Sequence, residues 1–296
     1  MRLLVVGANG LLGSNVVSAA RQRGLEVSGT YHSTEPAFDV PLAQFDLQKP
    51  HTFDALLDEY EPDVVVNCAA MTDVDGCEAS PEVAHTVNGE APGEMAARCE
   101  ASGTEFVHIS TDYVFDGDSR EPYSETATPN PVQVYGTSKH AGEQAVQNEM
   151  EDALVLRLSF VWGIHRGTGE LTGFPAWVQD QLASGEDVPL FTDQWITPTR
   201  AGQAADTLLG LAERNGSGLY HVACRTCATP YEFGENITDQ VGAESTSLSE
   251  GSMKGIEREA TRPTYTCLDV EKVETALGRQ QPTLREDIEV AWDAVD

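Results

Sequence analysis

The stretch that decides the fold is Gly7-Ala8-Asn9-Gly10-Leu11-Leu12-Gly13, which follows the apolar run Leu3–Val6 and precedes a helical pattern at Asn15–Arg23. Glycines at every third position suit a tight turn that brings backbone amides close to an anion. A helix that begins after such a turn adds free N–H groups and the positive end of its dipole. A strand, a glycine-rich turn and a helix in this order predict a site for the pyrophosphate of a dinucleotide.

Strands and helices alternate through the chain on either side of this turn. The apolar runs and the helical spacings predict strands at Glu26–Tyr31, Asp63–Val66, Glu105–Ser110 and Ala153–Leu158, and helices at His51–Glu59, Pro81–Ser102 and Val134–Met150. Short strands separated by helices form right-handed βαβ units. We therefore expect an α/β protein with a Rossmann-type, doubly wound parallel sheet.

The pattern changes after Arg157, where glycine, proline and aromatic residues become frequent. A helix at Ala201–Arg214 and a strand at Leu219–Val222 restore the earlier rhythm before a mixed tail. We predict a nucleotide-binding domain made of residues 1–158 and about 196–223. A smaller α/β substrate lobe would contain residues of about 159–195 and 224–296.

The charge balance limits the partners of the protein. The chain has 48 acidic and 18 basic residues, a net charge of −30, and the acid is spread along its whole length. A field of that sign repels nucleic acids and anionic membranes, so we expect neither as a partner. Dense carboxylates with only four lysines favour a protein from a salt-loving microbe, the alternative being an ordinary acidic enzyme.

Membrane and metal patterns are missing from the sequence. No apolar run approaches the length of a membrane span, and the chain enters its first strand directly, so we expect a cytoplasmic protein. Cys224 and Cys227 form a lone CxxC without the second pair that a structural zinc site needs. We therefore expect the six cysteines to be reduced thiols, and we assign no metal ligands.

The end of the second predicted strand indicates the cofactor. An acidic residue there accepts hydrogen bonds from the ribose of NAD, whereas this chain has Tyr31-His32-Ser33. These neutral groups can meet a 2′-phosphate, although no arginine stands beside them. The pattern favours NADPH and leaves NADH open. Asp46 and Leu47 follow the third strand, where they would meet the adenine; the alternative for Asp46 is a helix N-cap.

The residues Tyr135 and Lys139 form a YxxxK pattern at the start of a predicted helix, which puts both side chains on one face. A phenol has an ordinary pKa of about 10, and a nearby ammonium is expected to lower it. Tyr135 would then protonate a substrate oxygen while Lys139 holds the nicotinamide ribose. The third partner should be a hydroxyl at the end of an earlier strand, for which we choose Thr111 over Ser110.

Five motifs together resemble the dTDP-4-dehydrorhamnose reductases, which belong to the extended short-chain dehydrogenase/reductase superfamily. They are Asn67–Asp75, Ser110–Gly117, Tyr135–Glu143, the Asp193-Gln194…Pro198-Thr199 segment and Arg262-Pro263…Leu268-Asp269. The resemblance covers essentially the whole chain. It implies NADPH-dependent reduction of the 4-keto group of a nucleotide-linked 6-deoxysugar, from dTDP-4-dehydrorhamnose to dTDP-L-rhamnose.

The same resemblance implies roles for individual residues. The pyrophosphate would be held by Gly7, Asn9, Gly10, Leu11 and Leu12, and the cofactor would be lined further by Ala69, Ala70 and Thr72. The chemistry would belong to Thr111, Tyr135 and Lys139. The sugar nucleotide would be bordered by Thr72, Asp73, Val74, Asp112, Tyr113 and Gln194. Phe160 stands where the family commonly has tryptophan, and it could stack on the base or belong to the core. Some members bind magnesium at a dimer interface, so a homodimer is compatible with the sequence.

Two alternative functions stay open at this point. One is a sugar-nucleotide 4,6-dehydratase or 4-epimerase. Dehydratases of this superfamily carry glutamate where this chain has Tyr113, and epimerases usually have an acid where it has Tyr31, so both features favour a reductase. The other is a non-catalytic NADP-binding subunit that resembles the beta subunit of methionine adenosyltransferase, because Tyr135 and Lys139 can persist without turnover.

Overall fold

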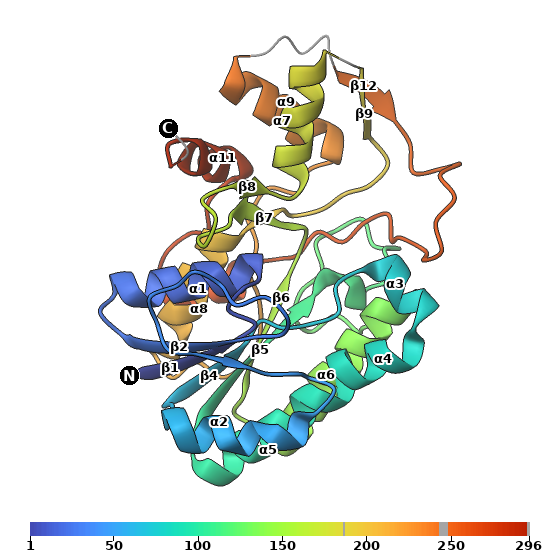
Figure 1. The fold of residues 1–296 in the computed structure, drawn as a ribbon. Helices are drawn as coiled ribbons and strands as arrows, with labels where there is room; N and C mark the ends of the chain where they lie inside the picture. The colour runs from blue at the N-terminus through green and yellow to red at the C-terminus, as the bar shows by residue number, and fades with distance from the viewer. Residues whose placement is uncertain (186, 243–247, 295–296) are drawn as a thin grey trace.

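A seven-stranded parallel sheet forms the centre of the protein (Figure 1). The structure is a computed structural model, and it describes residues 1–185, 187–242 and 248–294. The strand order is β11-β6-β5-β4-β1-β2-β3, and every neighbouring pair runs parallel. The strands are β1 (Arg2–Val6), β2 (Glu26–Tyr31), β3 (Leu42–Gln44), β4 (Val64–Asn67), β5 (Glu105–Thr111), β6 (Leu154–Leu158) and β11 (Gly218–His221). The expected Rossmann-type sheet is confirmed.

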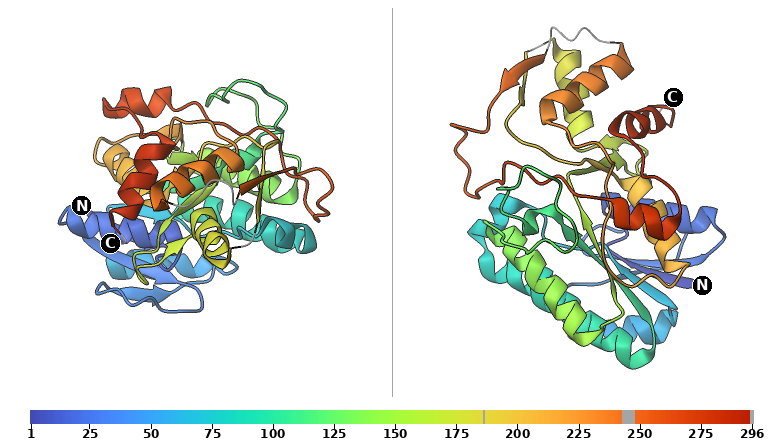
Figure 2. Two further views of the ribbon diagram at one scale, coloured as in Figure 1. Left: turned by 90° about the horizontal axis from the view of Figure 1, so that it is seen from above. Right: turned by 180° about the vertical axis from the view of Figure 1, so that it is seen from behind.

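Helices cover both faces of this sheet (Figure 2). One face carries α1 (Leu11–Gln22), α8 (Ala201–Ala212) and α10 (Glu271–Leu277), and the other carries α2 (Phe53–Tyr60), α5 (Ala91–Ser102) and α6 (Val134–Glu149). Along β1, Leu3 and Val5 join the core under the first set, whereas Leu4 and Val6 join the core under the second. The continuous apolar run that predicted this strand thus reflects a strand buried on both faces.

The predicted helix Pro81–Ser102 is three consecutive segments in the structure. α4 (Pro81–His85) passes into a π-helical turn, η2 (Thr86–Glu90), and then into α5. The side chain of Asn88 in this turn accepts from the Met71 N–H at 2.8 Å and donates to the Met71 carbonyl at 2.9 Å. It also donates to Ser138 Oγ at 3.1 Å. The irregular turn therefore ties the loop after β4 to helix α6.

A second group of elements lies above the carboxyl ends of the sheet strands (Figure 1). It contains two small sheets, one of β7 (Val161–Ile164), β8 (Leu171–Thr172) and β10 (Thr199–Arg200), and one of β9 (Val188–Phe191) and β12 (Leu248–Gly251). Its helices are α7 (Phe174–Ser184), α9 (Pro230–Val241) and α11 (Leu284–Trp292). A separate core around Trp162 and Phe233 joins them. The predicted domain boundaries stay a prediction.

The cysteines correct one expectation. Cys227 and Cys267 form a disulfide with 5.6 Å between their Cα atoms, so the expectation of reduced thiols is wrong for these two residues. The sequence hid this pairing because the partners lie 40 residues apart and meet only when Tyr265 runs beside Trp195. The other cysteines are free thiols.

Membrane-spanning helices and metal-binding clusters are absent from the part of the chain that the structure describes. No helix in residues 1–185, 187–242 and 248–294 is long and apolar enough to cross a membrane. Within the same residues, no group of three or more His, Cys, Asp or Glu side chains is arranged to hold a metal ion.

Candidate active site

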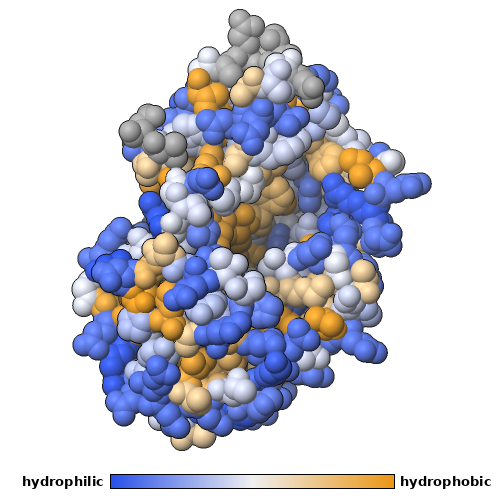
Figure 3. Space-filling view, in the orientation of Figure 1, coloured by the Kyte–Doolittle hydropathy of each residue, from blue (hydrophilic) through white to orange (hydrophobic). Residues whose placement is uncertain are grey.

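A cavity of about 770 Å³ lies at the carboxyl ends of the central strands. Figure 3 shows it as an apolar hollow between the sheet and the elements above it. It lies beside β1, the strand at which the order of the sheet reverses. β2 and β3 lie on one side of β1, and β4, β5 and β6 lie on the other. Open α/β sheets bind their ligands at such a switch point. Segments from β1, β2, β4, β5, α6 and the β6–β7 turn contribute to its wall.

The glycine-rich turn at one end of this cavity fits a pyrophosphate. Gly7 has φ +81°, and a Cβ there would lie 2.9 Å from that of Ala69. A Cβ on Gly13 would collide with the Gly7 carbonyl oxygen, so both positions need glycine. Gly10 caps α1 without any side chain, which leaves the first N–H groups of the helix facing an anion site. Gly7, Asn9, Gly10, Leu11 and Leu12 all line the cavity.

The predicted cofactor residues near β2 and β3 divide into two groups. Tyr31, His32 and Ser33 line the cavity, together with Thr34, which the sequence analysis missed. Asp46 and Leu47 do not line it. Asp46 Oδ1 accepts the Gln48 N–H at 2.9 Å and so stabilises the turn after β3. The N-cap of the helical turn that follows is Lys49, so the N-cap alternative for Asp46 is wrong. Leu47 is buried in the core beneath the sheet.

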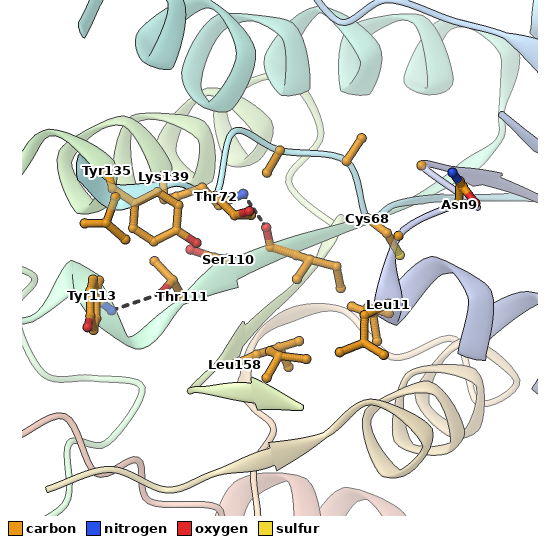
Figure 4. Close-up of a pocket in the computed structure, with 18 of the residues that line it drawn as sticks. Asn9, Leu11, Cys68, Thr72, Ser110, Thr111, Tyr113, Tyr135, Lys139 and Leu158 are labelled. Carbon is orange, nitrogen blue, oxygen red and sulfur yellow. Dashed lines mark hydrogen bonds between the residues drawn. The ribbon is translucent and has the colours of Figure 1, made fainter. Parts of the chain in front are cut away.

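The predicted catalytic residues meet at the other end of the cavity (Figure 4). Tyr135 and Lys139 lie in the first turns of α6, and Thr111 is the last residue of β5. Helix α6 lies close to the segment that follows β5, because Gly136 packs on the Tyr113 carbonyl. A Cβ at this position would collide with that carbonyl. Lys139 Nζ donates to the Ile109 carbonyl at 2.6 Å. Ser110, the alternative to Thr111, also lines the cavity.

Burial sets the protonation of this pair. Burial raises the pKa of Tyr135 and the Asp112 charge raises it further, against a lowering by the Thr111 hydrogen bond. The net shift of the Tyr135 pKa is therefore upward and not downward as expected, because loss of water around the phenolate outweighs the effects that stabilise it. Burial lowers the pKa of Lys139 to about 8, against the charges of Glu143 and Cys68, which raise it. A neutral phenol beside a mostly charged ammonium is suited to donating a proton.

A buried ion pair holds α6 against the sheet. Arg157 of β6 donates to both carboxylate oxygens of Glu143 at 2.7 Å. Burial raises the pKa of Glu143, but the hydrogen bonds and charge of Arg157 outweigh it and bring the pKa to about 2. This pair fixes the helix one turn beyond Lys139.

The predicted substrate residues lie mostly beside Tyr135. Thr72, Val74, Asp112, Tyr113 and Phe160 line the cavity, as do Ala69 and Ala70 on the cofactor side. Asp73 does not line it; its carboxylate accepts the Gly76 N–H at 3.0 Å and caps α3 (Val74–Ala79). Gln194 is also outside the lining but is buried next to Tyr113. Burial raises the pKa of Tyr113 to about 12, against a lowering by the Gln194 hydrogen bond.

Several lining residues carried no recognisable signal in the sequence. Cys68 directly follows β4, Leu158 ends β6, and Ile109 lies two residues before the end of β5, whereas Val161 and Phe174 come from the elements above them. These side chains belong to ordinary apolar runs, in which cavity and core positions look alike. The position of each at the carboxyl end of a strand is the one feature that could have identified the first three.

A family model and curated relatives assign the chain to one family. The whole chain, residues 1–296, matches the family model described as RmlD substrate binding domain. The probable low-salt glycan biosynthesis reductase Agl14 of Haloferax volcanii is 51% identical over 97% of this chain and 96% of that protein. The dTDP-4-dehydrorhamnose reductase of Mycobacterium tuberculosis is 34% identical over 90% of this chain and 84% of that protein.

A solved structure has the same fold. The dTDP-4-dehydrorhamnose reductase of Bacillus anthracis, in complex with NADP, matches with a TM-score of 0.87 at 24% identity. The match covers 99% of this chain and 98% of that one.

Proposed function

This chain belongs to the RmlD substrate binding domain family, and from that premise we propose that it uses NADPH to reduce the 4-keto group of a nucleotide-linked 6-deoxysugar. The proposed reaction converts dTDP-4-dehydrorhamnose to dTDP-L-rhamnose. The observation that carries the proposal is that Thr111, Tyr135 and Lys139 converge on a cavity whose other end is the glycine-rich turn. Relatives named as reductases support a ketoreductase of sugar nucleotides. The identity of the sugar as rhamnose and of the nucleotide as dTDP is proposed in addition to this reaction class.

In this mechanism, residues of the protein donate one proton to the substrate and hold the reacting groups in place. When bound, NADPH supplies the hydride that reduces the carbonyl carbon. Tyr135 donates its phenolic proton to the carbonyl oxygen, since its raised pKa keeps the phenol neutral until charge develops on that oxygen. The Lys139 ammonium then stabilises the phenolate that remains. Thr111 hydrogen-bonds Tyr135 and so orients the phenol for this transfer.

The cofactor proposal depends on the end of β2. Tyr31, His32 and Ser33 line the cavity and bring no carboxylate that would repel a 2′-phosphate. The same fold holds NADP in the Bacillus anthracis protein. The cofactor would extend from the glycine-rich turn to the catalytic residues, and the residues proposed to bind it line this length of the cavity. For the cofactor they are Gly7, Asn9, Gly10, Leu11, Leu12, Tyr31, His32, Ser33, Ala69, Ala70, Thr72, Tyr135 and Lys139.

The substrate would occupy the opposite end of the cavity. The residues proposed to border it are Thr72, Val74, Asp112, Tyr113 and Phe160. Tyr113 follows the Thr111-Asp112 pair where a dehydratase would need a carboxylate, so the proposed chemistry stops at reduction. The dTDP and rhamnose identities follow the Mycobacterium tuberculosis relative. The Haloferax volcanii relative is named as a glycan biosynthesis reductase, so the alternative substrate is a different nucleotide sugar used in glycan synthesis.

The test is NADPH oxidation by the purified chain in molar KCl, with dTDP-4-keto-6-deoxysugar as substrate and NMR to identify the product. Tyr135→Phe is expected to lower kcat by roughly 10²- to 10⁴-fold, because it removes the general acid. Its affinity for NADPH, followed by cofactor fluorescence, should remain. Absence of turnover by the wild type would favour the binding-subunit alternative. Full activity of Tyr135→Phe would refute the assigned proton donor.

A further inference from the structure

The carboxylate of Asp112 receives hydrogen bonds from two segments of the chain that end beside the cavity. Asp112 directly follows Thr111 at the end of β5 and is 2% exposed. Its Oδ1 accepts the Thr111 hydroxyl at 3.1 Å. Its Oδ2 accepts the Ser159 hydroxyl, from the turn between β6 and β7, at 2.7 Å. One side chain thus joins two segments that are far apart in the sequence.

Each of these segments carries a residue of the cavity wall. Thr111 lines the cavity itself (Figure 4). Ser159 precedes Phe160, which lines the cavity and packs edge to face on Phe174 with 5.5 Å between ring centroids. The Phe160 backbone has φ +47°, a left-handed conformation that a residue with a side chain adopts only when its surroundings hold it there. The turn that presents Phe160 therefore needs an external restraint.

The hydrogen bonds around Ser159 supply this restraint from two sides. Its hydroxyl is held by Asp112, and its N–H donates to Thr199 Oγ1 at 3.1 Å. Thr199 Oγ1 in turn donates to the Val222 carbonyl at 3.2 Å. Ser159 and Thr199 are both fully buried, so water does not compete for these bonds.

The geometry also fixes how Thr111 is used. Its single hydroxyl hydrogen is directed to Asp112, and its oxygen accepts the Tyr113 N–H at 3.2 Å. This leaves one lone pair for the cavity side, so the hydroxyl has a defined orientation there. Without the Asp112 carboxylate, the oxygen would still accept the Tyr113 N–H, but the hydroxyl hydrogen would lose the acceptor that fixes its direction.

We infer that Asp112 is a positioning residue that couples two neighbouring segments of the cavity wall, one carboxylate oxygen orienting the Thr111 hydroxyl and the other holding the turn that presents Phe160. The role rests on the proposed ketoreduction, because it assigns Thr111 to the reacting carbonyl and Phe160 to the sugar nucleotide. Asp112 itself transfers no proton in this arrangement. The orientation of the Thr111 hydroxyl and the position of the Phe160 ring then depend on the same carboxylate.

The first test separates kcat from KM in single variants. Ser159→Ala removes the side-chain part of the restraint on the Phe160 turn and keeps the backbone bond to Thr199, so KM for the sugar nucleotide should rise roughly tenfold while kcat changes little. Asp112→Ala should raise KM to the same extent and also lower kcat by roughly 10- to 100-fold. Asp112→Asn keeps an acceptor for Thr111 and offers an amide to Ser159, so it should recover most of both losses. An asparagine variant as poor as the alanine variant would overturn the inference.

The second test is the double variant. Once Asp112 is alanine, Ser159→Ala should cause no further rise in KM, because the bond it removes is already gone. An equal rise in KM in both backgrounds would overturn the coupling. Asp116→Ala is the matched control: Asp116 accepts from Tyr123 and Asn130 on the same loop but does not line the cavity. It should lower the melting temperature and leave kcat and KM unchanged.

A third measurement does not depend on turnover. Melting temperatures of the same four proteins (wild type, the two alanine variants and their double variant) should show the same non-additivity, with Ser159→Ala costing little once Asp112 is alanine. If the wild type reduces no 4-keto sugar nucleotide, the proposed function fails and this cycle still decides the coupling. Additive losses of melting temperature would refute the coupling even in an active enzyme.

Discussion

Lys139 gives the site a pH dependence that can be measured. Burial lowers its pKa from 10.5 to about 8, and the proposed mechanism uses the charged form, which exists below that value. We therefore expect kcat/KM for reduction to be flat below about pH 8 and to fall as the pH rises further. The measurement is a pH profile of kcat/KM, which reports on groups of the free enzyme.

Lys139→Met supplies the control for this profile. Its activity should be low at every pH, without a fall near the Lys139 pKa. The variant should also unfold at a higher temperature near neutral pH, because the unfolded chain binds the proton more tightly than the folded one. Stability of the wild type should accordingly rise between about pH 8 and 10.5, and that rise should be missing in the variant. A wild-type profile that stays flat well above pH 8 would contradict the assignment.

The sequence predicted residues best where spacing expresses a local geometry. Tyr135 and Lys139 face the cavity because four residues make one helical turn, and Gly7 is needed because its backbone lies in a left-handed region. The sequence did not predict properties that depend on how deeply a side chain is buried. The pKa of Tyr135 moves upward because the surroundings exclude water, which no residue pattern reveals. Asp46 does not line the cavity, and its carboxylate accepts the Gln48 N–H in a local turn, as aspartate often does.

Helix α6 depends on one glycine for its position against β5. A Cβ on Gly136 would collide with the Tyr113 carbonyl, so Gly136→Ala must push Tyr135 and Lys139 away from Thr111. We expect a loss of about 1–3 kcal/mol in unfolding free energy. We also expect kcat to fall by about 10²-fold, because misplacement by an ångström is enough to do so. Chemical denaturation and steady-state kinetics measure the two effects.

Gly210→Ala in α8 is the matched control for this substitution. Gly210 is also a helical glycine, and a Cβ there would make only a 3.4 Å contact with the Leu277 side chain. Alanine has the higher helix propensity, so stability should change by less than about 1 kcal/mol and activity should be kept. Equal losses in both variants would show that glycine is needed for helix packing in general and not for the site.

Elements were predictable from sequence to different degrees. β2 has the predicted bounds, since its ends are marked by neighbouring turn residues. α1 begins at Leu11, four residues before the predicted start, because Gly10 serves as its cap without a polar side chain. The π-helical turn at Thr86–Glu90 follows from contacts of Asn88 with Met71 and Ser138, which are distant in sequence. The β9–β12 pairing likewise joins segments that no local pattern connects.

The net charge of −30 should make the whole molecule depend on salt. Repulsion between carboxylates acts over about 10 Å in 0.1 M salt and about 3 Å in 1 M salt. We expect the melting temperature to rise by several degrees between these KCl concentrations, and sucrose should not reproduce the salt-specific part. Replacing exposed Glu100, Glu151 and Glu235 with glutamine should reduce this slope. A melting temperature that is independent of KCl would contradict the salt-loving interpretation.

The order of strands in the sheet has a consequence for the nascent chain on the ribosome. β6 emerges with all five of its residues destined for burial, but its outer neighbour β11 and the covering helix α8 are translated much later. At about 5–20 residues per second, the stretch between Leu158 and Gly218 takes seconds to appear. Throughout that interval β6 is the edge strand beside β5, and its outer side, where β11 will pair, is open. Translation rate and chaperone supply therefore bear on the yield of this protein as directly as the stability of its finished fold.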